Sequence, residues 1–437
     1  MANGDVDIVV EDVQGLFESI RSSPSAFPLI QILIDMVPSG RRDISPTSFD
    51  PRVVSIGPLH REDKTLQAFE HQKHMHASDL LNSPCGSSNQ TLKECVQKVL
   101  ATTDRIRACY DNIKIEKYND NELAKMMVID ACFILQFIRV LTNSSDEAVA
   151  FLRASSIIYD LMLFENQIPF FILQDIFDST ILTSEPKASL PHLILQLVQF
   201  FNIFETNIPV QSSYPIEPND HILGFLEKCF RPSKEYSPLQ ALPSVAMHST
   251  VELERSGVIF KPNIDARWAM TINFQSSTAF NCFSWSRDKP TLRMPVLRID
   301  NFTESILRNL IAYEQSSSSY RTCGYVTSYA MAMDMLVDTE EDIGKLIESK
   351  VVVNHLGSNE KAADMINSLC KELPFRRFYY FDDWREMDRH YNSYWPKNIA
   401  ALKRTYFSNP WSMIALVAAI VLFALTVVQT IYTVNAI

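Results

Sequence analysis

The stretch NELAKMMVIDACFILQFIRVL, from Asn121 to Leu141, is apolar along almost its whole length. A helix that is apolar nearly all round is buried, so this stretch predicts a largely buried core helix. Helical spacing or acidic first turns mark three further segments, 303–314, 339–349 and 360–372. We therefore expect a mainly helical fold, with Thr303 able to cap the start of its helix.

Residues 258–299 change character. Apolar side chains alternate with other residues in two runs, at Trp268, Met270, Ile272 and Phe274 and again at Leu292, Met294 and Val296. A period of two is the pattern of half-buried strands. The predicted class is thus α+β, mainly α with a small antiparallel β region.

Glycine is scarce, with ten in 437 residues, and the closest two, Gly4 and Gly15, are eleven positions apart. Phosphate-binding loops and nucleophile elbows need glycines a few positions apart. This excludes Rossmann, P-loop, kinase and α/β-hydrolase sites, and we expect no cofactor. The net charge of −11 with scattered basic residues argues against nucleic-acid binding.

The eight cysteines form no CxxC pair, and no metal-ligand spacing is present. Such usage in a long chain suggests a reducing compartment, although an even count leaves disulfides open. FEHQKHMHA places His71, His74 and His76 close together without a completing ligand, so a solvated helix face is the favoured interpretation. Asp382 and Asp383 are adjacent and diverge, which favours a surface or capping role.

The C-terminal run WSMIALVAAIVLFALTVVQTIYTV exceeds the ~20 apolar residues that span a bilayer. We predict a transmembrane helix over 411–433. Its interface anchors would be Trp411 and Tyr432, with Lys403 and Arg404 on the near side. The basic residues precede the span, so the bulk of the chain is expected in the cytosol as a single-pass, tail-anchored protein. Plasma membrane and endomembrane both remain open.

The rest of the domain plan follows from composition. Residues 1–25 are expected to form a flexible acidic tail without a cleaved signal, 26–395 the main domain, 396–410 a juxtamembrane segment and 434–437 a short tail. Ala415 and Ala419 form one small-xxx-small pair, which is weak evidence for a homodimer through the membrane helix.

Polar residues interrupt the apolar segment DLMLFENQIPFFILQDIF at Glu165, Asn166 and Gln167. Buried polar groups need partners, so we expect a structural network that joins Glu165 and Gln167 to an arginine. The candidate arginines are Arg52 and Arg308, and Glu314 is a second acid of the expected network. A catalytic carboxylate in a cleft is the alternative, but no nucleophile or metal set accompanies it. His60, in FDPRVVSIGPLH, has no partner within reach by sequence.

Eight segments, taken in order, resemble the plant family called domain of unknown function 247. They include VSIGPLH, DACFILQFIR, DLMLFENQIPFFIL, VELERSGVIF, RMPVLRIDNFTESILRNLIAYEQ and the C-terminal apolar run. The resemblance implies a mostly helical domain with a membrane helix and no established enzymatic activity. Some grass members are associated with pollen-side determinants of self-incompatibility. The chain departs from the family pattern at PSVAMHSTVELERSG, where Met247 and His248 could mark a member-specific recognition surface.

These observations predict a tail-anchored plant membrane protein, not an enzyme, whose cytosolic domain recognises or scaffolds protein partners of unknown identity. One alternative is a pollen-side self-incompatibility determinant, and a second is an enzyme with a cryptic site around Glu165 and Glu314. The sequons at Asn89, Asn143 and Asn301 would remain unmodified in the cytosol, so they provide a test of topology.

Overall fold

A computed structural model describes residues 34–82, 88–110, 113–143, 147–205, 217–232, 248–264, 268–276, 289–316, 324–373, 378–393 and 410–435. The tail expected over 1–25 lies outside these residues, as does nearly all of the juxtamembrane segment 396–410. The described chain is mainly helical with a small sheet region, which confirms the coarse fold class.

Helix α6 (Asp120–Thr142) is the centre of the N-terminal helical part. Most of its side chains are buried, and it packs against α3 (Glu70–Leu81), α4 (Ser88–Leu100) and α8 (Phe170–Ser179). A capping box fixes its start, because the Asn119 side chain accepts from the Glu122 amide while the Glu122 carboxylate accepts from the Asn119 amide. The buried helix predicted over 121–141 is confirmed.

The remaining described helices range from 4 to 26 residues. They are α2 (Ser39–Ile44), α5 (Thr103–Ala108), α7 (Glu147–Asp160), α9 (Ile181–Ser184), α10 (Leu190–Gln199), α11 (Ile222–Cys229), α12 (Thr250–Arg255), α13 (Thr303–Gln315), α14 (Tyr325–Leu336), α15 (Glu340–Glu348), α16 (Asn359–Leu369), α17 (Phe381–Tyr391) and α19 (Pro410–Asn435). Three 3₁₀ turns cover Pro46–Ser48, Gln67–Phe69 and Ile113–Ile115.

Helices α13, α15 and α16 confirm the three segments expected from spacing. Thr303 does not cap α13 as expected, because the N-cap position is Phe302 and makes no side-chain cap bond. Instead the Thr303 hydroxyl accepts a hydrogen bond from the Asp300 amide at 2.9 Å. Thr303, the first residue of α13, therefore stabilises the loop that leads into the helix.

Within the described residues, two small sheets lie in the C-terminal part. In the first, β3 (Thr291–Met294) lies between β1 (Ile259–Pro262) and β2 (Asn273–Gln275). In the second, β4 (Leu297–Ile299) pairs with β5 (Val352–Asn354). Strands were expected in this region, but the antiparallel arrangement was wrong for two of the three pairings. Among the described strands, β2 and β3 pair antiparallel, whereas β1 with β3 and β4 with β5 pair in parallel. The chain passes through β2 between β1 and β3, and through α13, α14 and α15 between β4 and β5, so neither parallel pair is a simple hairpin.

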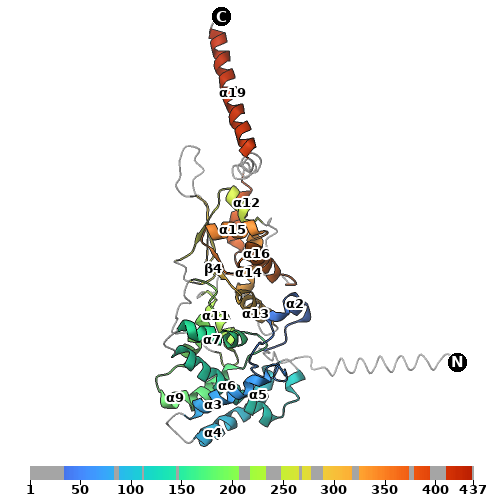
Figure 1. Ribbon diagram of the computed structural model, residues 1–437, viewed down its shortest axis with the longest axis vertical. Helices are drawn as coiled ribbons and strands as arrows, with labels where there is room; N and C mark the ends of the chain where they lie inside the picture. Colours follow the sequence, from blue (N-terminus) through green and yellow to red (C-terminus); the bar gives the residue numbers. More distant parts are fainter. Residues whose placement is uncertain are drawn as a thin grey trace, which may run out of the picture.

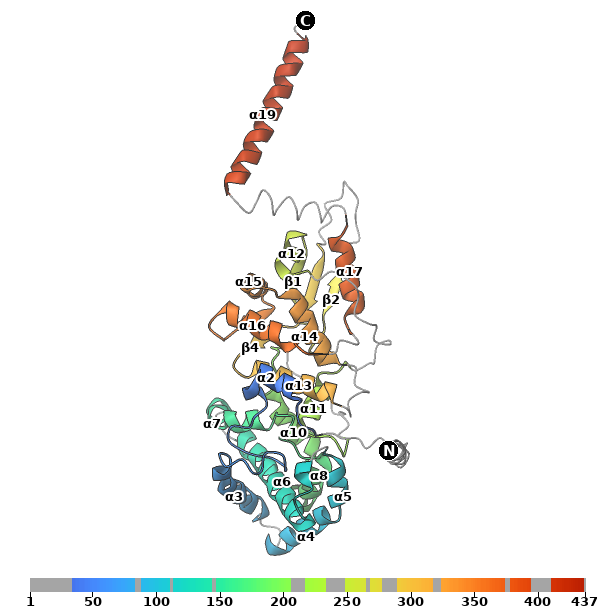
Figure 2. The same cartoon turned by 90° about the vertical axis from the view of Figure 1, so that its right-hand side faces the viewer.

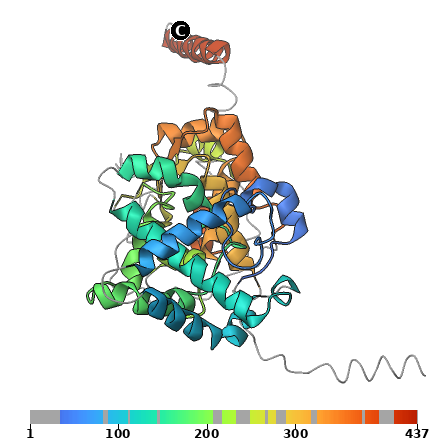
Figure 3. The ribbon, with the colours of Figure 1, turned by 60° about the horizontal axis from the view of Figure 1, so that its bottom comes forward.

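Figures 1 and 2 show the N-terminal helices α3 to α10 at one end of the body and α12, α15, α16 and the strands toward the other. Figure 3 turns the N-terminal helices of the body toward the viewer, with α3 packed against α6. Helix α13 belongs to the C-terminal part and also contacts α11 and the turn Pro46–Ser48. One continuous apolar core therefore runs through both parts.

Helix α19 covers the apolar C-terminal run for 26 residues. Within the described parts of the chain, the structure has no helix that combines the length and the apolarity needed to cross a membrane. The transmembrane helix over 411–433 therefore stays a prediction. Lys403 and Arg404 lie outside the described residues, and so do the side chains of Trp411 and Tyr432.

Candidate functional site

The segment Phe49–His60 crosses the body mostly as irregular chain, so its backbone amides need acceptors outside a helix or sheet. Asp160, at the end of α7, supplies three of them. Its Oδ1 accepts from the Arg52 amide at 2.8 Å, and its Oδ2 accepts from the amides of Val53 at 2.7 Å and Val54 at 2.8 Å. One buried carboxylate thus fixes three consecutive residues more than a hundred positions away.

Asn166 extends this attachment with its side-chain amide. Its Oδ1 accepts from the Ile56 amide at 2.6 Å, and its Nδ2 donates to the carbonyls of Val54 at 3.0 Å and Asp160 at 2.9 Å. Both ends of the amide are used, so Asn166 is satisfied although it is only 1% exposed.

A buried ion pair between α3 and α6 also binds the segment Phe49–His60. Lys73 of α3 donates from Nζ to Asp130 Oδ1 of α6 at 2.7 Å and to the Ser55 carbonyl at 2.6 Å. The other oxygen of Asp130 accepts from the Gly57 amide at 2.8 Å. The segment therefore crosses between a cation and a carboxylate that also bind each other.

Gly57 is required where the segment turns. Its φ is +71°, and a Cβ placed there would lie 2.8 Å from the Gln167 carbonyl and 3.0 Å from the Tyr110 hydroxyl. Gln167 itself is held by its side chain, whose Nε2 donates to the carbonyls of Leu161 at 2.8 Å and Leu163 at 2.9 Å. A side chain at position 57 would meet both backbone strain and a rigid neighbour.

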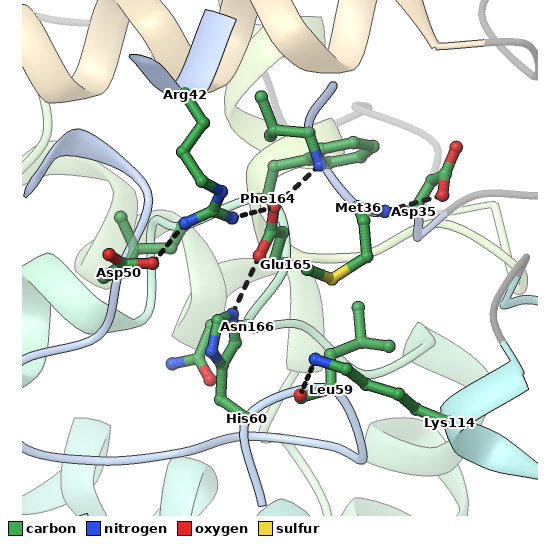
Figure 4. Close-up of polar contacts among 12 residues, drawn as sticks. Asp35, Met36, Arg42, Asp50, Leu59, His60, Lys114, Phe164, Glu165 and Asn166 are labelled. Atoms are coloured by element: carbon green, nitrogen blue, oxygen red, sulfur yellow. Dashed lines mark hydrogen bonds and ion pairs between the residues drawn. The ribbon is translucent and has the colours of Figure 1, made fainter. Parts of the chain in front are cut away.

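Glu165 forms a second centre beside this segment, as Figure 4 shows. Its Oε1 accepts from the Val37 amide at 2.7 Å and pairs with the Arg42 guanidinium, and its Oε2 lies 2.9 Å from His60 Nε2. Arg42 also pairs with Asp50. The Glu165 side chain is fully buried, whereas that of Arg42 is partly exposed. Solvent therefore contacts the arginine of this pair and not the carboxylate.

The pKa values of Glu165 and Asp160 shift in opposite directions. Burial alone would raise the pKa of Glu165, but the hydrogen bonds from His60 and the Val37 amide and the charge of Arg42 bring that pKa below its ordinary value. Burial raises the pKa of Asp160 to about 6, and the amide hydrogen bonds offset only part of that effect. Neutral amides are the main partners of Asp160, with a smaller effect from the charge of Arg52, whereas Glu165 pairs directly with the Arg42 guanidinium.

The arginine that pairs with Glu165 is Arg42, rather than either arginine expected from the sequence. The Arg52 guanidinium lies over the Tyr159 ring, 3.9 Å from its centroid. Arg308 donates from Nε to Glu304 at 2.8 Å, one helical turn earlier. A local i,i+4 partner was available to Arg308, and sequence separation does not show which distant arginine the fold brings to Glu165.

Glu314 lies in a different cluster. It accepts from the amides of Val326 at 2.9 Å and Thr327 at 2.7 Å, so it satisfies amides in the first turn of α14. Burial, followed by the charge of Glu227, raises the pKa of Glu314 to about 7. Glu227 has its own cation, Arg231, at 2.7 Å. Glu165 and Glu314 therefore do not converge on one site.

The other candidate side chains are dispersed. His71 and His74 are exposed on α3, whereas the His76 ring lies edge-on to Phe133 with centroids 5.4 Å apart. Among the described residues, no group of three metal-ligating side chains comes together. Asp382 pairs with Arg385 on the surface of α17, and Asp383 accepts from a β2 amide, which ties these two elements together.

His248, at the departure from the family pattern, is largely buried. Its ring stacks on Tyr391 with centroids 3.7 Å apart, and its Nε2 lies 3.0 Å from Asp388 Oδ1. Met247 lies outside the described residues. The His248 side chain thus joins the chain just before α12 to α17 instead of facing outward as a recognition surface.

Sequence reasoning missed Asp160, Asp130, Lys73 and Arg42. The available signal was charge inside apolar sequence, since Asp130 interrupts MMVIDACFIL and Asp160 opens the apolar run that holds Glu165. A buried charge predicts a partner without saying which one. These contacts fix Phe49–His60 against α3, α6 and α7. Glu165 is in contact with a backbone amide, a guanidinium and an imidazole.

Comparison with known proteins identifies relatives that cover most of the chain. A family model, DUF247, described as plant protein of unknown function, matches residues 34–425. UPF0481 protein At3g47200 of Arabidopsis thaliana is 25% identical, with 95% of this chain and 90% of the relative covered. The putative UPF0481 protein At3g02645 of the same plant is 23% identical, with 92% and 90% covered. No solved structure matches.

Proposed function

Since the chain belongs to the DUF247 family of plant proteins of unknown function, we propose that it is a membrane-attached module that recognises or scaffolds other proteins and is not an enzyme. Helix α19 would be the attachment, and the body formed by α2 to α17 would present the recognition surfaces. The self-incompatibility role remains a prediction from the resemblance.

The observation that carries the attachment is the exposure of α19. Ten of its large apolar side chains are between 41% and 72% exposed, from Ile414 to Ile431. Elsewhere in the described chain, such exposure occurs only at scattered positions, such as Ile264. A contiguous exposed apolar surface of this length requires a bilayer or a protein to cover it.

The hydrogen-bond partners of the buried acids support a role without catalysis. Asp160 and Asp130 accept from backbone amides, and Glu165 accepts from an amide and two basic side chains. Neither Glu165 nor Glu314 lines the pocket between α7 and α13 or the open hollow beside β5. These groups are committed to holding chain segments together.

Membrane attachment is tested with the full chain translated in the presence of microsomes and then extracted with alkaline carbonate. The wild-type chain is expected to stay with the membranes, and L422R/L425R is expected to be released, because each central arginine costs about 2.5–3.5 kcal/mol on insertion. The matched control, I264R, places an arginine at an exposed apolar side chain of the body and should stay bound. Extraction of the wild-type chain would refute the attachment.

Orientation is tested in the same system. Asn89, Asn143 and Asn301 are all exposed, so the oligosaccharyl machinery could reach them if the body entered the lumen. We expect no glycosidase-sensitive mass shift, in agreement with a cytosolic body. A shift that N89Q/N143Q/N301Q abolishes would place the body in the lumen. Proximity labelling from a functional tagged copy then tests recognition, with L422R/L425R as the mislocalised control.

A further inference from the structure

A pocket lies at the junction of the N-terminal and C-terminal parts. Its walls come from α7, from the chain that follows α10, and from β4 and the start of α13, and the centre of a water molecule could occupy about 40 Å³ of it. Figures 1 and 2 show α7 next to this junction. Most of the lining is apolar, with Ile158, Met162, Phe200, Phe302 and Ile306 among the side chains. Apolar pockets between two parts of a fold are a common location of small-molecule sites.

The polar groups deep in the pocket are already satisfied. The Tyr159 hydroxyl donates to the Thr47 carbonyl at 2.8 Å and lies 3.1 Å from Ser305 Oγ. Asn309 accepts from the Phe164 amide at 2.8 Å and donates to the Ser305 carbonyl at 2.8 Å. A ligand would gain little by bringing a polar group to these walls, so the part that enters the pocket should be apolar.

Two charged side chains line the pocket. Arg298, on β4, has a side chain that is 40% exposed, and the side chain of Asp300 is 31% exposed. Arg298 Nη2 donates to the Asn202 carbonyl at 2.9 Å, and its Nε lies 3.4 Å from Asp300 Oδ2, beyond good hydrogen-bond length. Within the described chain, Nη1 makes no such contact. The carbonyl contact orients the guanidinium without neutralising it, and Asp300 compensates its charge at a longer distance.

We propose that this pocket binds a small amphipathic carboxylate. Its aromatic or short aliphatic body would lie among the apolar side chains of α7 and α13, and its carboxylate would pair with Arg298 at the mouth. Guanidinium and carboxylate match in geometry and charge, whereas an amide of the same shape lacks the charge. This site is independent of membrane attachment and of the polar contacts that hold Phe49–His60.

The test is isothermal titration of the full chain in lipid nanodiscs with 3-phenylpropanoate and with its neutral isostere 3-phenylpropanamide, against empty nanodiscs. The wild-type chain is expected to bind the acid saturably and roughly tenfold more tightly than the amide. R298Q should remove this difference by weakening the acid alone. The matched control R385Q changes an exposed arginine on α17 and should leave both affinities unchanged.

Blocking variants locate the binding. I306W places an indole at a buried residue of the lining and S155W places one at a half-buried residue of the lining, so binding of both probes should be lost in each variant that retains the wild-type unfolding midpoint. Absence of saturable binding to the wild-type chain would overturn the proposal. Binding that survives S155W, or an acid preference that survives R298Q, would overturn it as well.

Discussion

Lys73 Nζ lies 2.7 Å from Asp130 Oδ1, and neither side chain has any exposure to solvent. The two residues come from α3 and α6, and between them they also bind the Ser55 carbonyl and the Gly57 amide. The pair therefore connects two helices to an irregular segment. Its value for the fold lies in satisfying backbone groups that have no partner in a helix or strand.

Substitution K73M should destabilise the protein by about 3–5 kcal/mol, because it leaves Asp130 as a buried charge without its cation. The measurement is urea unfolding of the full chain in detergent, followed by tryptophan fluorescence. K64M, at an exposed lysine, is the control and should change the free energy of unfolding by less than about 0.5 kcal/mol. Equal stability of K73M and K64M would contradict the role assigned to the pair.

Position 57 requires glycine both for its positive φ and for the close approach of the Gln167 carbonyl. The variants G57A and G357A distinguish these two effects. Gly57 and Gly357 both have positive φ, +71° and +81°, but a Cβ would clash only at Gly57. G357A should cost about 1–2 kcal/mol from conformation alone. G57A should cost more, since the Gln167 carbonyl must also move. The difference in unfolding free energy measures the close approach, and a larger effect of G357A would rule this explanation out.

Replacement of Asp160 by asparagine keeps its shape but exchanges one accepting oxygen for an NH₂ group. At least one amide among Arg52, Val53 and Val54 then loses its acceptor, at a cost of about 1–3 kcal/mol. Protection of these amides in hydrogen exchange should fall along with the unfolding free energy. D382N, at an exposed carboxylate, serves as the control, and unchanged protection in D160N would exclude Asp160 as the acceptor.

The raised pKa of Glu314 predicts that the free energy of unfolding depends on pH. Its pKa is raised by burial from 4.5 to about 7, so the folded state holds this proton more tightly than the unfolded state does. The contribution is complete below pH 4.5 and is lost as pH rises through about 7. Glu227, whose pKa burial also raises, acts in the same direction.

The free energy of unfolding should therefore fall between pH 5 and pH 8, with roughly 1–3 kcal/mol of that fall due to Glu314. E314Q, which resembles the protonated acid, should flatten the profile in this window. E116Q, at an exposed acid, should leave the profile unchanged. A profile for E314Q that parallels the wild type would show that Glu314 does not titrate there.

The amino-acid sequence by itself determined the local elements. The apolar run 121–141 could only be a buried helix, and α13, α15 and α16 follow their spacing and first-turn signals. It also placed strands within 258–299. These features depend on interactions within one or two helical turns or between alternate residues of a strand, which sequence order encodes directly.

Tertiary structure alone decided the partners. It selected Arg42 and His60 for Glu165 across more than a hundred residues, gave Arg308 to Glu304, and set two of three strand pairings parallel. Sequence order shows that a buried charge must be satisfied, because leaving it alone is costly. It does not show which cation arrives, because that depends on how the helices pack and on the path that Phe49–His60 takes between them.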